Sequence, residues 1–169
     1  MTEQRSPILS HLFTAIFLEA LVGTMLGMVL GANGGWIGHW LADAVHAGQG
    51  KDRIGYLVLG MLGAAVLGVA GGVYATGRVL GQRGAWWTAL LGSLLGTVLG
   101  IGVFAMLGPL HLPFFISGGF IAGGVVMLAL IGYHRTWGFP LGAWWAVLLG
   151  SLLGAVLGYS ALAGGLIFQ

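Results

Sequence analysis

The sequence predicts an all-α integral membrane protein with five transmembrane helices, glycine-zipper packing and one interfacial amphipathic helix. Apolar residues make up 58% of the 169-residue chain and charged residues only 6%, whereas about a quarter of the residues in soluble domains are charged. Five apolar segments are each long enough to cross a bilayer, which takes about 20 residues. The 34 glycines occur inside these segments, unlike the pattern of collagen or of a flexible linker.

Short polar connections separate the five expected spans. Pro109 and Pro113 lie between the third and fourth spans, and Pro140 precedes the fifth. Proline cannot continue the hydrogen-bond ladder of a helix, so these positions indicate tight turns. The expected spans are roughly Ile8 to Leu30, Ile54 to Thr76, Ala85 to Leu107, Phe114 to Tyr133, and Ala143 to Phe168.

One segment of the chain occurs twice. Residues 84–100 read GAWWTALLGSLLGTVLG, and residues 142–158 read GAWWAVLLGSLLGAVLG. The repeat indicates an internal duplication, in which spans two and three form a helical hairpin and spans four and five form its copy. We therefore expect a single membrane domain made of a first span with an outer interfacial helix (1–53), a first hairpin (54–108) and a second hairpin (109–169).

Small residues recur at every fourth position along the expected spans, which places them on one side of each helix. Lipid tails are as apolar as leucine, so membrane helices associate through close backbone approach. A helical glycine costs about 1 kcal/mol relative to alanine, and packing must compensate for that cost. These faces are either consumed within one chain or partly left for another subunit. The glycines expected at helix contacts are Gly23, Gly27, Gly31, Gly68, Gly72, Gly92, Gly96, Gly100, Gly150, Gly154 and Gly158.

The distribution of basic residues predicts the orientation. Four arginines fall on the side of the N-terminus, whereas the two basic residues on the other side are offset by Asp43 and Asp52. We therefore expect a bacterial inner-membrane protein with its N-terminus in the cytoplasm and its C-terminus outside. Six basic residues are too few and too scattered for a nucleic-acid partner. The first group is Arg5, Arg78, Arg83 and Arg135, and the second is Lys51 and Arg53.

Glu19 is the charged residue expected deep inside a span, about 15 Å along the helix from its start. No Lys or Arg is expected at that depth, and an unpaired charge there costs at least a few kcal/mol. We therefore expect a protonated carboxyl group that is hydrogen-bonded to a hydroxyl, with Ser93 and Ser151 at similar depth. The bond either fixes helix register, or the residue takes part in a proton or cation relay or donates to a bound cofactor.

Residues 36–46 form the expected interfacial helix, with its tryptophans on one side and His39, Asp43 and His46 on the other. These three residues are possible metal ligands, although a solvated polar face explains the same pattern. His11 and His134 lie near span ends on the same side of the membrane. They are possible ligands of a pigment or haem, or they reach to water.

No motif for an enzymatic reaction occurs in the sequence, and the lack of cysteine excludes thiolate chemistry and covalently attached haem. We expect a non-enzymatic structural or accessory subunit that packs through its glycine-rich helix faces within a larger membrane complex. Its expected partners are membrane lipids and either other membrane subunits or further copies of the chain. The alternatives are a small proton or ion channel or transporter that uses Glu19, and a pigment- or haem-binding membrane subunit.

Overall fold

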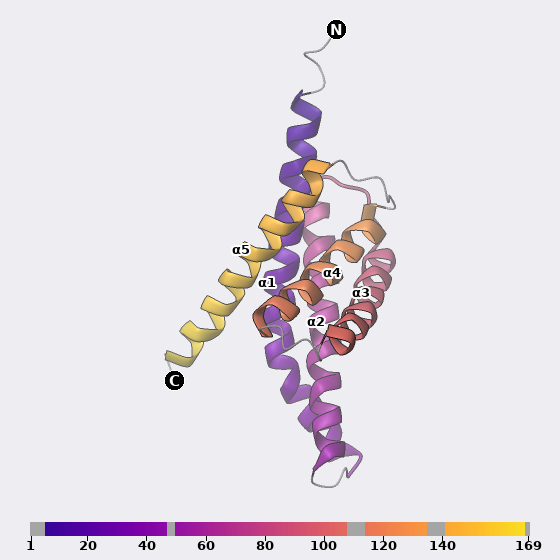
Figure 1. Cartoon of the computed structure of the whole chain (residues 1–169), viewed down its shortest axis with the longest axis vertical. Coiled ribbons are helices and arrows are strands. Elements are labelled where there is room, and N and C mark those ends of the chain that lie inside the picture. Colours follow the sequence, from indigo (N-terminus) through magenta and orange to yellow (C-terminus); the bar gives the residue numbers. More distant parts are fainter. Residues whose placement is uncertain (1–5, 47–49, 108–113, 135–140, 168–169) are drawn as a thin grey trace.

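The computed structural model describes residues 6–46, 50–107, 114–134 and 141–167, and this part of the chain is helical without a strand. The expected all-α class is therefore confirmed. In Figure 1 the first and second helices lie side by side along the long axis, and the later helices run at an angle to them. The helices are α1 (Ser6–Ala44), α2 (Lys51–Val79), α3 (Trp86–Leu107), α4 (Phe114–His134) and α5 (Leu141–Ile167).

Three helices contain segments that are long and apolar enough to cross a membrane, within the described residues. These segments cover most of α1, nearly all of α2 and most of α5, and they favour association with a membrane. The apolar segments of α3 and α4 are shorter. The long segments are His11–Ala44, Asp52–Val79 and Ala143–Gly164, and the shorter ones are Trp86–Gly102 and Gly124–His134.

The helices form two packing groups. In the first, α1 lies along α2 on one side and along α5 on the other. In the second, α3 packs against α4, and this pair contacts α1 and α2 less extensively. The buried core lies where the two groups meet, and its largest fully buried side chains are Tyr133, Ile16, Leu130, Glu19, Val73 and Val126.

The expected interfacial helix is not a separate element. Residues 36–44 continue α1 without a break, so that the helix runs for 39 residues from Ser6 to Ala44. Two glycines explain the continuation, because Gly34 and Gly38 lie against the backbone of Gly60 on α2. Tertiary contact therefore keeps this glycine-rich stretch helical in spite of its low helix propensity.

The two expected hairpins do not pack as equivalent units. The first copy of the repeated segment lies in α3, and its main partner is α4. The second copy lies in α5, and its main partner is α1, while α4 and α5 share only a small contact. A glycine-rich face accepts any helix that approaches closely, so the repeat alone does not determine which helix it meets.

The glycines expected at contacts lie between particular helices. Glycines of α1 face valine and alanine of α2, and a Cβ atom added at Gly72 would lie 2.7 Å from the Cα atom of Gly23. Gly100 is buried. The other glycine neighbours are as follows: Gly23, Gly27 and Gly31 meet Val73, Val69 and Ala65; Gly68 meets Leu26 and Gly27; Gly92 and Gly96 meet Leu128 and Val125; and Gly150, Gly154 and Gly158 meet Ala20, Leu21 and Met28.

Candidate functional site

A buried acid–imidazole pair joins the two packing groups. Glu19 on α1 is completely buried, and its Oε2 atom lies 2.7 Å from Nε2 of His134, the last residue of α4. The side chain of His134 is 12% exposed. A cationic imidazole is favoured at a helix C-terminus, where backbone carbonyls carry partial negative charge.

The register of α1 against α2 places this pair near one end of the bundle. Gly23 meets Val73 and Gly27 meets Val69, so one turn forward along α1 corresponds to one turn back along α2, as in any antiparallel pair of helices. Continuing the register by one turn places Glu19 opposite Gly77, close to the end of α2 at Val79. The sequence indicated a hydroxyl partner for Glu19, but the C-terminal end of α4 reaches the same level and brings an imidazole instead.

Tyr133 holds the imidazole in place. Its ring lies edge-on to that of His134, with centroids 5.0 Å apart and planes at 84°. The ring packs onto Gly77 and Gly84, where a Cβ atom at either position would overlap it. The Tyr133 hydroxyl donates a hydrogen bond of 3.4 Å to the carbonyl oxygen of Gln82.

That carbonyl belongs to the turn that follows α2. Gly81 has a φ of 75°, and the backbone N–H of Gln82 donates to the carbonyl of Gly77 over 2.8 Å. The N–H of Gly81 donates to the carbonyl of Arg78 over 3.1 Å. These two bonds are those of a Schellman motif, which requires a left-handed residue and so favours glycine. The chain is thereby turned toward Tyr133.

The expected hydroxyl partners do not bond to Glu19. Ser93 Oγ donates instead to the carbonyls of Leu90 and Val66, at 2.9 and 3.4 Å. Ser151 Oγ and Glu19 Oε1 are both buried and have no hydrogen-bond partner among the described residues. Ser151 follows Gly150, which contacts Ala20, so the two oxygen atoms lie at about the same level of the bundle.

The other candidate residues lie elsewhere. His39 and Asp43 both bond to Arg53 on α2, and His46 is exposed at the end of α1. His11 is exposed on α1, about 12 Å along the axis before Glu19, so the structure gives it no shared site with His134 for a haem or pigment. Among the described residues, no three His, Asp or Glu side chains are grouped to hold a metal ion.

A carboxyl group and an imidazole in contact can share one proton or exchange it. With the proton on the imidazole, the pair is a short charge-assisted hydrogen bond, which is stronger than a neutral one. Imidazole is the side chain that changes charge in the physiological range. The arrangement can therefore bind and release a proton between α1 and α4.

Comparison with other proteins adds no assignment. The chain matches no known protein family, no curated protein and no solved structure.

Proposed function

We propose that this chain is a non-enzymatic membrane protein that acts as a small proton channel or transporter, with Glu19 and His134 as its proton-binding site. The observation that carries the proposal is the 2.7 Å contact between a fully buried carboxyl group and an imidazole on another helix. Ionisable groups within membrane proteins are rare and mark ion and proton pathways. A carboxyl group in contact with an imidazole forms a pair that can share or pass on a proton.

Two polar levels of the α1–α2 hairpin support a membrane-spanning arrangement. Glu19 marks one level, and the ion pair of Asp43 with Arg53 marks the other, at an N–O distance of 3.0 Å. The two levels lie about 36 Å apart along α1 at 1.5 Å per residue. A bilayer has a hydrocarbon core of about 30 Å and a total thickness of about 40–45 Å with its headgroups. The hairpin between the two levels therefore fits one bilayer.

Within this arrangement, we place all five helices across a bacterial inner membrane, with their glycine faces packed as zippers. The N-terminus and the arginines Arg78 and Arg83 are then cytoplasmic, and the C-terminus is outside, in accord with the positive-inside rule. In this orientation Glu19 and His134 lie at the cytoplasmic edge of the hydrocarbon core, and not deep inside the first span as the sequence indicated.

The position of the pair suggests how proton binding is coupled to helix movement. Glu19 belongs to the group of α1, α2 and α5, and His134 belongs to the pair of α3 and α4. Adding or removing one proton changes the attraction between these side chains in a surrounding of low dielectric. A ligand shifts a conformational equilibrium when it binds one state better than another, so a proton at this site changes the position of α4 relative to α1.

Proteoliposomes with an internal pH-sensitive dye test the proposal. The wild-type protein is expected to dissipate an imposed pH gradient faster than protein-free liposomes, whereas Glu19→Gln and His134→Gln reduce the rate to that of the lipid alone. Two exposed residues give matched controls: His11→Gln and Asp52→Asn keep the wild-type rate. An unchanged rate in Glu19→Gln rejects the proposed site.

A second candidate function is the accessory subunit, and one observation favours it. Among the described residues, a Cβ atom added at Gly55, Gly63 or Gly71 of α2 meets no neighbour within 4 Å, so these glycines face open space in that part of the chain. These glycines are free for another membrane helix. Native mass spectrometry of protein gently extracted from its own membranes tests this candidate: a foreign subunit that Gly71→Leu releases supports it, and a bare chain in the wild type argues against it.

A further inference from the structure

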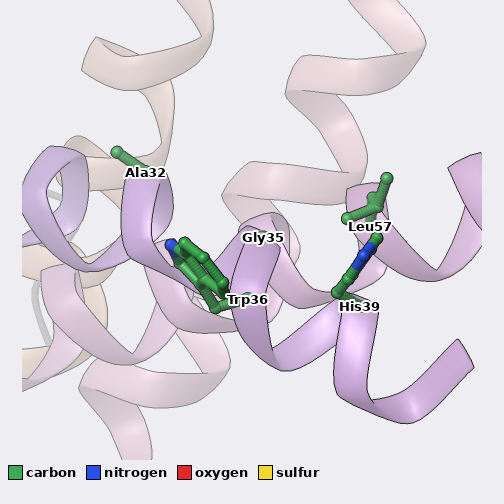
Figure 2. Close-up of a pocket in the computed structure, with 5 residues that line it drawn as sticks. All are labelled: Ala32, Gly35, Trp36, His39 and Leu57. Atoms are coloured by element: carbon green, nitrogen blue, oxygen red, sulfur yellow. The ribbon is translucent and has the colours of Figure 1, made fainter. Parts of the chain in front are cut away.

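A groove lies near the closed end of the α1–α2 hairpin, far from the proton site. Figure 2 shows Trp36 beside Ala32 on one side of the groove and His39 beside Leu57 on the other, with Gly35 between them. Its volume is about 260 Å³. Among the described residues, Met61 alone has side-chain atoms near Gly35, the nearest of them 3.7 Å from the position of an added Cβ atom, so the groove is open because position 35 has no side chain.

A pair of opposite charges adjoins one end of this groove. Arg53 Nη2 donates to His39 Nε2 over 2.9 Å and to Asp43 Oδ1 over 3.0 Å. A guanidinium has five N–H donors, and both of these bonds use one nitrogen atom, so donors remain for an anion. The Asp43 side chain is 61% exposed, and that of Arg53 is 32% exposed. A ligand can therefore reach the cation and the anion together.

The groove runs in the direction that a lipid tail would take. Its lining extends along α1 from His39, beside the charged pair, to Ala32, which is closer to the middle of the hairpin. Trp36 and Trp40 are 78% and 69% exposed at this level. Tryptophan is enriched where lipid headgroups meet the hydrocarbon core.

We infer that this groove binds one zwitterionic phospholipid. The phosphate accepts hydrogen bonds from Arg53, and the primary ammonium group donates to Asp43. The first part of one acyl chain lies between Trp36 and Leu57. A headgroup that carries both charges matches a site that carries both, whereas the net negative charge of an anionic headgroup is repelled by Asp43. The inference rests on the membrane placement proposed above and not on proton transport.

Native mass spectrometry of the purified full-length protein tests the inference, with equal amounts of phosphatidylethanolamine and phosphatidylglycerol of the same chain length. We expect one retained phosphatidylethanolamine per chain. Gly35→Leu fills the groove and removes the bound lipid, whereas Gly63→Leu retains it, because position 63 of α2 faces open space. Asp43→Asn removes the preference for phosphatidylethanolamine.

Four outcomes would overturn the inference. The wild type could retain both lipids equally, or it could prefer phosphatidylglycerol, and either result excludes recognition of the ammonium group. Equal retention by Gly35→Leu and Gly63→Leu excludes the groove. Competition by soluble glycerophosphoethanolamine as strong as that by the whole lipid would likewise exclude an acyl chain between Trp36 and Leu57.

Discussion

A double-mutant cycle across Glu19 and His134 is expected to give a large coupling energy. His134→Ala leaves the completely buried carboxyl group of Glu19 without the bond to His134, and breaking a buried pair in this way costs about 3–5 kcal/mol. Glu19→Leu removes the carboxyl group and keeps a similar volume. Because His134 lies at a helix end and is 12% exposed, this second change costs about 1–2 kcal/mol.

The double variant is expected to lose less stability than the sum of the two single losses. It contains no buried carboxyl group, so the largest penalty of the His134→Ala variant does not occur. The coupling energy should be about 2–3 kcal/mol, at the upper end of the range for residues in contact.

Reversible unfolding of the four proteins in mixed micelles, followed by tryptophan fluorescence, measures this coupling. Thr97 provides a control, because its hydroxyl bonds to the Ser93 carbonyl on its own helix, over 2.9 Å. Thr97→Val combined with Glu19→Leu should be additive. A coupling below about 0.5 kcal/mol between Glu19 and His134, which is the usual error of additivity, would refute the proposed contact.

Two further predictions concern glycines with matched controls. Gly77→Ala is expected to destabilise the protein by about 1–3 kcal/mol in thermal unfolding, because the added methyl group overlaps the Tyr133 ring. Gly71→Ala on the same helix meets no described neighbour and should stabilise the protein by about 0.5 kcal/mol. Equal effects of the two substitutions would contradict the packing argument. Gly154→Leu should expose α5 to protease in micelles, because the new leucine side chain meets the backbone of α1. Gly164→Leu should leave α5 protected, because position 164 meets no described neighbour. Equal protection of α5 in both variants would contradict the assigned contact.

The positions of the helices could be predicted from apolar length and proline. The fourth expected span, Phe114 to Tyr133, differs from α4 by one residue at its end, and the third differs from α3 by one residue at its start. The continuation of α1 beyond Leu30 could not be predicted in the same way. It depends on contact between Gly34 or Gly38 and another helix, and local propensity does not contain that contact.

The sequence identifies Glu19 and His134 separately as candidate residues, but it does not predict that they contact each other. Glu19 stands out because a carboxyl group in an apolar span requires a partner. His134 was a candidate only as a pigment or haem ligand, and its contact with Glu19 could not be predicted, because 115 residues separate the two positions and a histidine at a span end has an ordinary explanation in water. The register that aligns Asp43 with Arg53 and brings Glu19 near the end of α2 is seen in the structure and not in the sequence.

The two copies of the repeated segment have different polar contacts. Ser93 and Ser151 occupy the same position of the repeat, but only Ser93 meets a backbone carbonyl of another helix, that of Val66 on α2. The surroundings of Ser151 differ because α5 packs on α1. Glu19 and His134 lie outside both copies of the repeat. The two copies therefore present similar glycine-containing faces to different helices, and the contacts of their polar side chains follow from the helix that each copy meets.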